Sequence, residues 1–276
     1  MTRKSPPIFV FLSHDVDWGK EGAPKSHILE RKDRFDEATL NNLDEKNPYQ
    51  NIPEILDIEE GYGVRSTFFF RACTDSRHRP PPYNLEDYKS DIQSMISGGW
   101  EVGLHSDFLS HDNLERLRQE KRWLEDISRA GIFGNRTHNM IGEDMHASLL
   151  GNLKMLGFRY DSSVKYNRDY ITQRDFGFFV DMGVIVFPIT LMDALIFPNA
   201  ESEADVLKIV KQAVDVCERL PSRRVMTIIW HNCSLKMRFG RKYTEVLEHL
   251  ISRKNVSVKT GIELSDMIEK NEIHHL

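Results

Sequence analysis

Short hydrophobic runs alternate along this chain with longer segments in which apolar residues recur every three or four positions. The runs are rich in β-branched and aromatic residues and predict strands at residues 8–12, 66–71, 100–104, 184–189 and 225–230, with weaker ones at 132–137 and 158–161. The helical spacing predicts helices at residues 88–96, 112–130, 204–220, 243–251 and 264–268. Strands that alternate with helices predict crossover connections and a parallel sheet.

This alternation predicts an α/β fold. About seven strand–helix units in 276 residues favour a single irregular (β/α) barrel of about seven strands, in one domain over residues 1–276. A doubly wound open sheet is the alternative, because periodicity does not show whether a sheet closes. We expect the polar stretch 19–49 to form an excursion after the first strand, at the end of the barrel where such loops build active sites.

Composition and charge narrow the class of protein. Hydrophobic residues make up 40% of the chain and charged residues 29%, as in ordinary globular proteins. The net charge of -5 provides no basic face for nucleic acid. Cys73, Cys217 and Cys233 lack metal or redox spacing, so we expect reduced thiols. No run resembles a secretory signal or an integral membrane segment, which predicts a cytoplasmic location; the sequence leaves a homo-oligomer open.

Chemically active side chains fall where the predicted strands end. In a parallel barrel the carboxyl ends of the strands lie on one face, so these side chains can converge although they are far apart in sequence. Their positions therefore predict an active site on that face. The residues are Asp15 and Asp17, His105, Arg136 and His138, Asp161, Asp193, and His231.

Asp15 and Asp17 follow the first strand in His14-Asp15-Val16-Asp17. Alternate side chains of an extended chain point the same way, so the two carboxylates would lie side by side. Such a pair repels unless a cation lies beside it. A metal ion bound by one carboxylate would leave the other free as a base, whereas the alternative is an aspartate-rich turn without a ligand.

Two histidines six residues apart, His105 and His111, are candidate metal ligands. Together with Asp17 they form a His-His-Asp set, which suits zinc or another divalent ion and leaves a position for water, as catalytic sites do. Asp107 is an alternative or additional ligand. Without a metal, His105 would simply end its strand and His111 would precede the next helix.

The remaining strand-end residues have roles around this metal set. Arg136 could pair with Asp15 and keep it ionised, or form a surface salt bridge. His231 could protonate a departing amine, or be a core histidine. We expect Asp161 to hydrogen-bond His231, with a turn cap as the alternative, and Asp193 to contact the substrate, with a loop cap as the alternative.

In sequence order these motifs resemble the polysaccharide deacetylase (NodB-homology) family of carbohydrate esterases, as a divergent branch. The resemblance implies a general base at Asp15, a positioning arginine at Arg136, a general acid at His231, and a divalent metal, zinc first among candidates, on Asp17, His105 and His111. The motifs that carry it are Ser13-His14-Asp15-Val16-Asp17, residues 63–69, His105-Ser106 with His111, Asn135-Arg136-Thr137-His138, Tyr160-Asp161-Ser162-Ser163 and Ile229-Trp230-His231.

The chain departs from the family pattern in two motifs. The family places its second-motif histidines four residues apart, not six. Thr137, His138 and Asn139 replace the proline and aromatic residue that usually follow the arginine. We expect His138 to bind substrate from this position.

The resemblance implies a metal-dependent hydrolase that acts on a non-peptide C–N (amide) bond and removes an acetyl or formyl group from an N-acylated sugar. A cytoplasmic enzyme would act on a precursor sugar in cell-surface polysaccharide, O-antigen or other lipopolysaccharide biosynthesis. Two alternatives remain open: a catalytically inactive sugar-binding barrel and a metal-dependent phosphoesterase.

Overall fold

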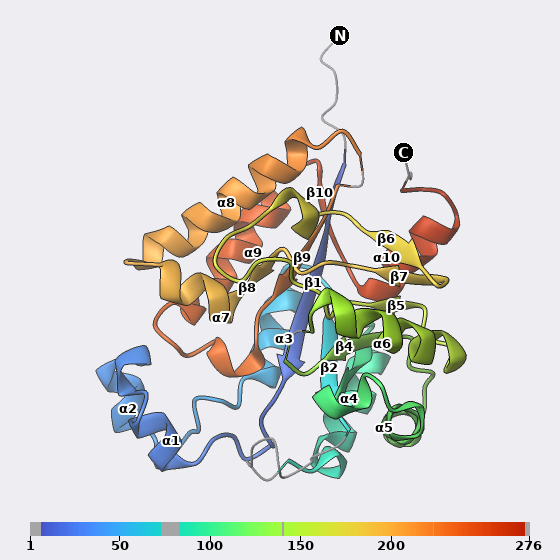
Figure 1. The fold of residues 1–276 in the computed structure, drawn as a ribbon. Helices are drawn as coiled ribbons and strands as arrows, with labels where there is room; N and C mark the ends of the chain where they lie inside the picture. The colour runs from blue at the N-terminus through green and yellow to red at the C-terminus, as the bar shows by residue number, and fades with distance from the viewer. Residues whose placement is uncertain (1–6, 73–82, 140, 223, 274–276) are drawn as a thin grey trace.

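A computed structural model describes residues 7–72, 83–139, 141–222 and 224–273 of the protein (Figure 1). Its helices are α1 Lys25–Leu29, α2 Glu37–Asn41, α3 Ile52–Gly61, α4 Lys89–Ser97, α5 Leu114–Ser128, α6 Glu143–Met155, α7 Asp193–Ile196, α8 Glu203–Arg219, α9 Tyr243–Ser252 and α10 Gly261–Glu269. Its strands are β1 Ile8–Val16, β2 Thr67–Arg71, β3 Glu101–Ser106, β4 Gly134–Thr137, β5 Tyr160–Asp161, β6 Phe179–Asp181, β7 Val184–Val186, β8 Leu191–Met192, β9 Val225–Ile229 and β10 Val256–Lys259.

The described strands form one sheet in the order β6-β7-β5-β4-β3-β2-β1-β9-β8, and β10 also pairs with β1. Every ladder is parallel except the one between β6 and β7. The first half of β1 pairs with β10 and its second half with β2, while β9 runs along its other edge. The parallel ladders place the carboxyl ends of the main strands on one face.

Residues 184–192, the closing segment, join the two ends of the sheet. β7 in this segment pairs with β5, and β8 pairs with β9. Between them, the Phe187 amide donates to the Asp161 carbonyl (2.9 Å) and the Thr190 amide to the Thr227 carbonyl (3.1 Å). The prediction of an irregular (β/α) barrel is confirmed. The strand number exceeds seven because β6 and β10 are added and the closing segment contributes two strands.

Aromatic rings fill the half of the barrel at the amino ends of the strands. Gly103 and Gly134 lie so close to these rings that a Cβ would collide with Phe69 at the first position and with Tyr160 at the second. α10 covers this end of the barrel with Leu264. The barrel is therefore a packed core with a floor for the polar site above it. The rings, hereafter the aromatic plug, have centroids 5.3–6.5 Å apart and belong to Phe11, Phe69, Tyr160 and Phe187.

The outer helices pack on the opposite side of the strands, because alternate strand residues point away from the barrel axis. Val10 and Leu12 of β1 and Val210 of α8 belong to this outer core. α4, α5, α8, α9 and α10 lie within one to three residues of the predicted helices.

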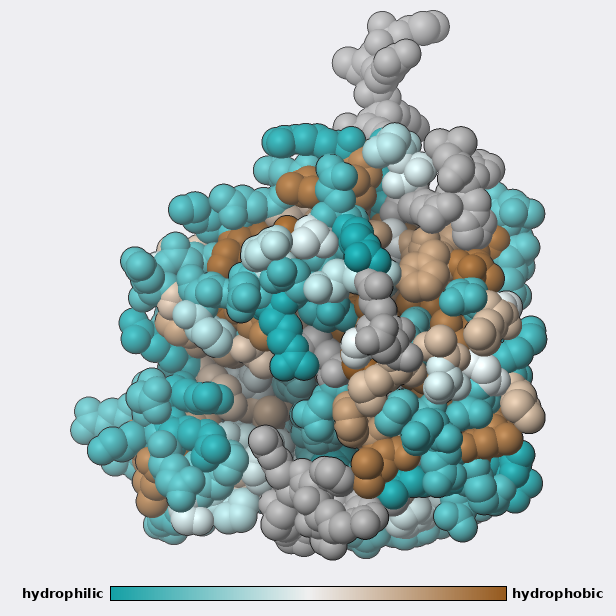
Figure 2. Space-filling view, in the orientation of Figure 1, coloured by the Kyte–Doolittle hydropathy of each residue, from teal (hydrophilic) through white to brown (hydrophobic). Residues whose placement is uncertain are grey.

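The polar stretch 19–49 forms the expected excursion, which contains α1 and α2 and lies at the lower left of Figure 1, beside the carboxyl end of β1. It has a small core of its own, in which Ile28 and Tyr49 pack with Cys233 and Met237 from the segment after β9. Figure 2 shows a largely hydrophilic face that is hollowed below its centre, beside the excursion formed by residues 19–49. Among the described helices, none is long and apolar enough to cross a membrane.

Candidate active site

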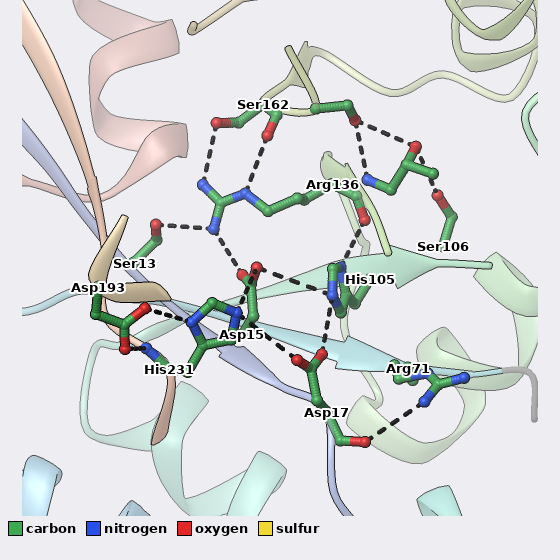
Figure 3. A network of polar contacts seen from close by, with 12 residues as sticks. Ser13, Asp15, Asp17, Arg71, His105, Ser106, Arg136, Ser162, Asp193 and His231 are labelled. Carbon is green, nitrogen blue, oxygen red and sulfur yellow. Dashed lines mark hydrogen bonds and ion pairs between the residues drawn. The ribbon is translucent and has the colours of Figure 1, made fainter. Parts of the chain in front are cut away.

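A cavity of about 180 Å³ lies at the carboxyl ends of the strands, above the aromatic plug. The first strand delivers Asp15 and Asp17 to the same side, because they are two residues apart in extended chain. β3 delivers His105 and the end of β9 delivers His231 (Figure 3). The lining residues are Asp15, Asp17, His105, Arg136, Thr137, His138, Asn139, Ile189, Met192, Ala194 and His231.

Asp17, His105 and His138 form a group that could hold a metal ion, with one ligand atom from each and all three atoms within 4.8 Å of one another. The Nδ1 of His105 lies 2.8 Å from the carbonyl oxygen of Arg136. A carbonyl only accepts hydrogen bonds, so this nitrogen carries a proton and turns the other, Nε2, toward the cavity. That Nε2 lies 3.1 Å from Asp17 Oδ1.

Two buried atoms in this group accept or donate no hydrogen bond within the described chain: Asp17 Oδ1 and His138 Nδ1. Buried polar atoms are normally paired, so unpaired ones in residues whose ligand atoms lie this close together indicate a missing ligand. A carboxylate and two imidazoles suit zinc and other divalent first-row ions, and three protein ligands are typical of catalytic sites. The residues therefore fit a divalent metal ion.

Arg136 has the expected ion pair with Asp15: its guanidinium donates to Asp15 Oδ1 at 2.7 Å. It also donates to the hydroxyl of Ser13 (2.9 Å) and to the carbonyl and hydroxyl oxygens of Ser162 (both 3.0 Å), and its charged group lies 4.3 Å from the ring centroid of Phe69. Burial raises the pKa of Asp15, but the nearby charges of Arg136, His105 and His231 together outweigh burial, so the net pKa is lowered. Asp15 is thus held as a carboxylate.

His231 is held by Asp193, the first residue of α7. Its Nδ1 donates to Asp193 Oδ1 (2.6 Å) and its amide to Oδ2 (2.9 Å). Its Nε2 faces the cavity, 3.6 Å from Asp17 and 3.9 Å from Asp15. Burial disfavours the imidazolium, yet the carboxylates of Asp193, Asp17 and Asp15 together outweigh burial and raise the pKa of His231 to about 10. His231 can therefore offer a proton to a group in the cavity.

The structure differs from the sequence prediction for the two aspartates expected near His231. Asp161, expected to hydrogen-bond His231, instead bonds His146 Nε2 (3.0 Å) and accepts from Asn135 (2.8 Å) and Ser163, so its oxygens are occupied. Asp193, expected to contact substrate, is fully buried beneath His231. The hydrogen-bonded partner of the histidine is thus Asp193.

The structure does not place His111 with Asp17 and His105. His111 follows a 3₁₀ turn, its Nδ1 lies 2.7 Å from the Phe108 carbonyl oxygen, and it is not among the residues that line the cavity. Asp107, the alternative ligand, caps the same turn by accepting from Leu109 (2.9 Å) and pairs with Arg116 (3.3 Å). Both are occupied locally.

His138, assigned to substrate binding from the sequence, occupies the third position of the group instead. β3 and β4 pair His105 with Arg136, so the residue two further along β4 comes beside His105. The two imidazole rings are stacked, with centroids 5.1 Å apart and planes 4° apart.

Several cavity residues were not identified from the sequence. Ser13, which does not line the cavity but accepts from Arg136, was predictable in principle, since it lies two residues before Asp15 on the same face of β1. Ile189, Met192 and Ala194 make the apolar wall, but they belong to the closing segment and α7, whose position depends on barrel closure. Asn139 adopts a left-handed backbone (φ 63°), which a sequence pattern does not show.

The comparisons with known proteins agree with this description. The sequence model of the family described as "Polysaccharide deacetylase" matches residues 35–131. No curated protein matches the sequence.

Several solved structures share the fold. A probable polysaccharide deacetylase from Pseudomonas aeruginosa PAO1 is 15% identical, with a TM-score of 0.66 over 97% of this chain and 93% of that one. Puue allantoinase is also 15% identical, with a TM-score of 0.64 over 99% and 94%. A CE4 family pseudoenzyme from Bacillus anthracis is 14% identical, with a TM-score of 0.52 over 95% and 67%. At these identities the structures show the fold alone. The resemblance to the polysaccharide deacetylase family that the motifs predict is therefore confirmed by sequence across residues 35–131, and the solved structures share the fold across almost the whole chain.

Proposed function

We propose that the protein is a metal-dependent hydrolase that removes an N-acyl group, acetyl or formyl, from an amino sugar. The observation that carries the proposal is the arrangement of Asp17, His105 and His138 beside Asp15 and His231 around one cavity. It combines a metal-ligand set with a base and an acid, which are the parts that amide hydrolysis requires.

Asp17, His105 and His138 would hold the metal, and zinc is the first candidate for a carboxylate with two imidazoles. When bound, a divalent ion supplies Lewis acidity, which lowers the pKa of water and polarises an acyl carbonyl. Asp17 is suited to bind it as a carboxylate, because burial raises its pKa but the neighbouring histidines lower it further. His138 is suited as a neutral imidazole, because burial lowers its pKa to about 3.

The side chains divide the proton transfers between them. Asp15 accepts a proton from the attacking water, whose oxygen adds to the acyl carbon. His231 donates a proton to the sugar nitrogen as the C–N bond breaks, which yields the free amine and a carboxylic acid. Asn139 lines the cavity, and its backbone N–H donates no backbone hydrogen bond within the described chain. This N–H is our candidate donor to the acyl carbonyl oxygen as negative charge develops there.

The cavity supports a small acyl group. At about 180 Å³ it is smaller than most ligand pockets, and Ile189, Met192 and Ala194 form an apolar wall opposite the charged residues. An acetyl methyl or a formyl hydrogen would pack against this wall. We further propose a sugar precursor of cell-surface polysaccharide, O-antigen included, as the substrate class.

Metal content, by elemental analysis of the purified protein, tests the proposal first. We expect near-stoichiometric divalent metal in the wild type, loss in His105→Ala and His138→Ala, and retention in the matched histidine variant His111→Ala. Loss in His111→Ala with retention in His138→Ala would overturn the ligand assignment.

The metal-loaded protein would then be given a panel of N-acetyl and N-formyl amino sugars, free, nucleotide-linked and lipid-linked, with a phosphate monoester alongside. Release of acetate or formate supports the proposal. Phosphate release would favour the phosphoesterase alternative. The described residues, however, contain one three-residue group that could hold a metal ion, whereas phosphoesterases often bind two metal ions. Metal binding with no turnover of any substrate would favour an inactive barrel.

A further inference from the structure

A buried histidine–glutamate pair lies behind the active site, on the outer side of the barrel wall. His14 precedes Asp15 in β1, so its side chain points away from the cavity and is fully buried. Its ring packs on Phe68, with centroids 4.6 Å apart, and its Nε2 lies 2.8 Å from Glu59 Oε1. Glu59 comes from α3 and is also fully buried. The mechanism above uses neither residue.

His14 ends the ladder between β1 and β9. That ladder stops at Ser13 and Ile229, after which the Trp230 amide donates to the Ser13 carbonyl (2.9 Å). In a continued parallel ladder the Trp230 carbonyl would accept from the backbone of β1. Instead it lies 2.6 Å from His14 Nδ1, which therefore carries a proton. The chain then leaves the sheet at His231.

Glu59 fixes the ring of His14 in this position. Besides His14, its two carboxylate oxygens accept from the hydroxyl of Tyr243 (2.5 Å), the hydroxyl of Ser66 (2.8 Å) and the indole of Trp100 (2.6 Å). These donors come from α9, the start of β2 and the start of β3. A buried carboxylate with this many donors is rigid and satisfied, so it orients the imidazole as outer partners orient a metal-bound histidine.

We propose that His14 and Glu59 are positioning residues that set the placement of the general base relative to the general acid. The base, Asp15, is bonded through the chain to His14, and the acid, His231, to Trp230, so the 2.6 Å hydrogen bond from the His14 ring to the Trp230 carbonyl links the two segments that carry them. Across the cavity Asp15 Oδ2 and His231 Nε2 are 3.9 Å apart. The inference rests on the proposed function, because it takes the base and acid roles from it.

Kinetics of three variants test the proposal. Glu59→Gln weakens the orientation of His14, and the double variant His14→Phe with Glu59→Leu replaces the pair by apolar groups, so that no buried charge is left without its partner. Both should lower kcat by roughly 10- to 100-fold with KM changed less than about twofold and metal content unchanged.

Glu101→Gln is the matched control. Glu101 also accepts three hydrogen bonds, from the Tyr160 hydroxyl, the Thr67 hydroxyl and the Ile262 backbone amide. It lies, however, at the opposite end of β3 from His105. It should lose stability with kcat kept. Equal kcat losses in Glu59→Gln and Glu101→Gln would show that only general stability is involved.

A spectroscopic readout keeps this test separate from the proposed function. The ring nitrogens of His231, assigned in ¹⁵N spectra by comparison with His231→Ala, should shift in Glu59→Gln and in the double variant but not in Glu101→Gln. An unchanged His231 signal in both would overturn the positioning role, whatever the activity. A wild type that hydrolyses no N-acyl sugar would instead count against the proposed function, while the shift of the His231 signal would still support the positioning.

Discussion

Among the charges near Asp15, the Arg136 guanidinium does most to lower the pKa of this carboxyl group. Arg136 is buried and makes four hydrogen bonds, of which the one to Asp15 is the shortest at 2.7 Å. The bonds to Ser13 and Ser162 fix the guanidinium, so its charge cannot turn away from Asp15. Asp15 is therefore kept ionised with the help of a rigid partner, and its remaining oxygen faces His105 and His231.

Replacement of Asp15 by asparagine tests this residue directly. A carboxamide at this position cannot accept a proton from water, so we expect Asp15→Asn to lower kcat by about 10²–10⁴-fold, the usual contribution of a general base. Metal content should be retained, because Asp15 is outside the ligand group. Hydrolysis of an N-acyl sugar and elemental analysis on the same sample measure both. Full activity in this variant would remove Asp15 from the mechanism.

At this scale the sequence predicts which residue types reach the cavity better than which of them meet. Asp15, Asp17, His105, Arg136 and His231 were placed correctly at strand ends, because each follows a readable hydrophobic run. The exchange of Asp161 for Asp193, and of His111 for His138, depends on strand register and on how a turn folds. Periodicity contains neither.

The turn before α5 shows how an element determines which histidine is available. Glu120 on α5 accepts from the Ser110 hydroxyl (2.6 Å) and the Asp107 amide (3.2 Å), and so holds the turn that carries His111 against the helix. Glu120 is almost fully buried, and burial raises its pKa to about 7 although these hydrogen bonds lower it. The element therefore includes a carboxyl group that titrates near neutral pH.

The free energy of unfolding should change with pH because of the Glu120 carboxyl group. Below the ordinary pKa of 4.5 both the folded and the unfolded carboxyl are protonated, whereas between 4.5 and about 7 only the unfolded one loses its proton. The free energy of unfolding should therefore fall as pH rises through this range, by up to about 3 kcal/mol at 1.36 kcal/mol per pKa unit. Urea unfolding of the wild type and Glu120→Gln at pH 4.5 and pH 8 measures it. The variant should lack this part of the loss; a difference between the two proteins that is equal at both pH values would contradict the assignment.

Among the elements, long amphipathic helices were the most predictable. α8 has apolar residues on one face and begins with a capping box of Ser202 and Asp205, which the sequence shows directly. α3 and α6 were not predicted, and neither were β6, β8 and β10. These strands have two to four residues, too few for a periodic signal, and pairing with neighbours defines them.

At the scale of the whole molecule, closure of the barrel depends on a few contacts of the closing segment. The Thr190 hydroxyl donates to the Asp175 carbonyl (2.6 Å) and accepts from the Thr227 amide (3.0 Å). It thus ties together the loop before β6, the closing segment and β9. The two neighbours of this tie along the chain, Ile189 and Leu191, face the cavity and the outer core respectively.

Removal of this hydroxyl should weaken the closure. Thr190→Val keeps the shape but leaves a buried carbonyl and a buried amide unpaired, so we expect a loss of about 2 kcal/mol in the free energy of unfolding. Thr227→Val is the matched control, since the Thr227 hydroxyl is buried without a partner within the described chain and its loss should cost little or stabilise. Urea unfolding of both variants compares them. A Thr227→Val protein that is less stable than Thr190→Val would refute this account.

The pairing of the closing segment at both of its ends also limits how its sequence can change during evolution. In its first half Val184 and Val186 face the outer core while Ile185 and Phe187 face the aromatic plug, and both ends of the segment are fixed in register, to β5 and to β9. An insertion or deletion of one residue between them would turn Ile189 out of the cavity or break one of the ladders. This apolar part of the cavity wall can therefore change by substitution, but not by a change in length.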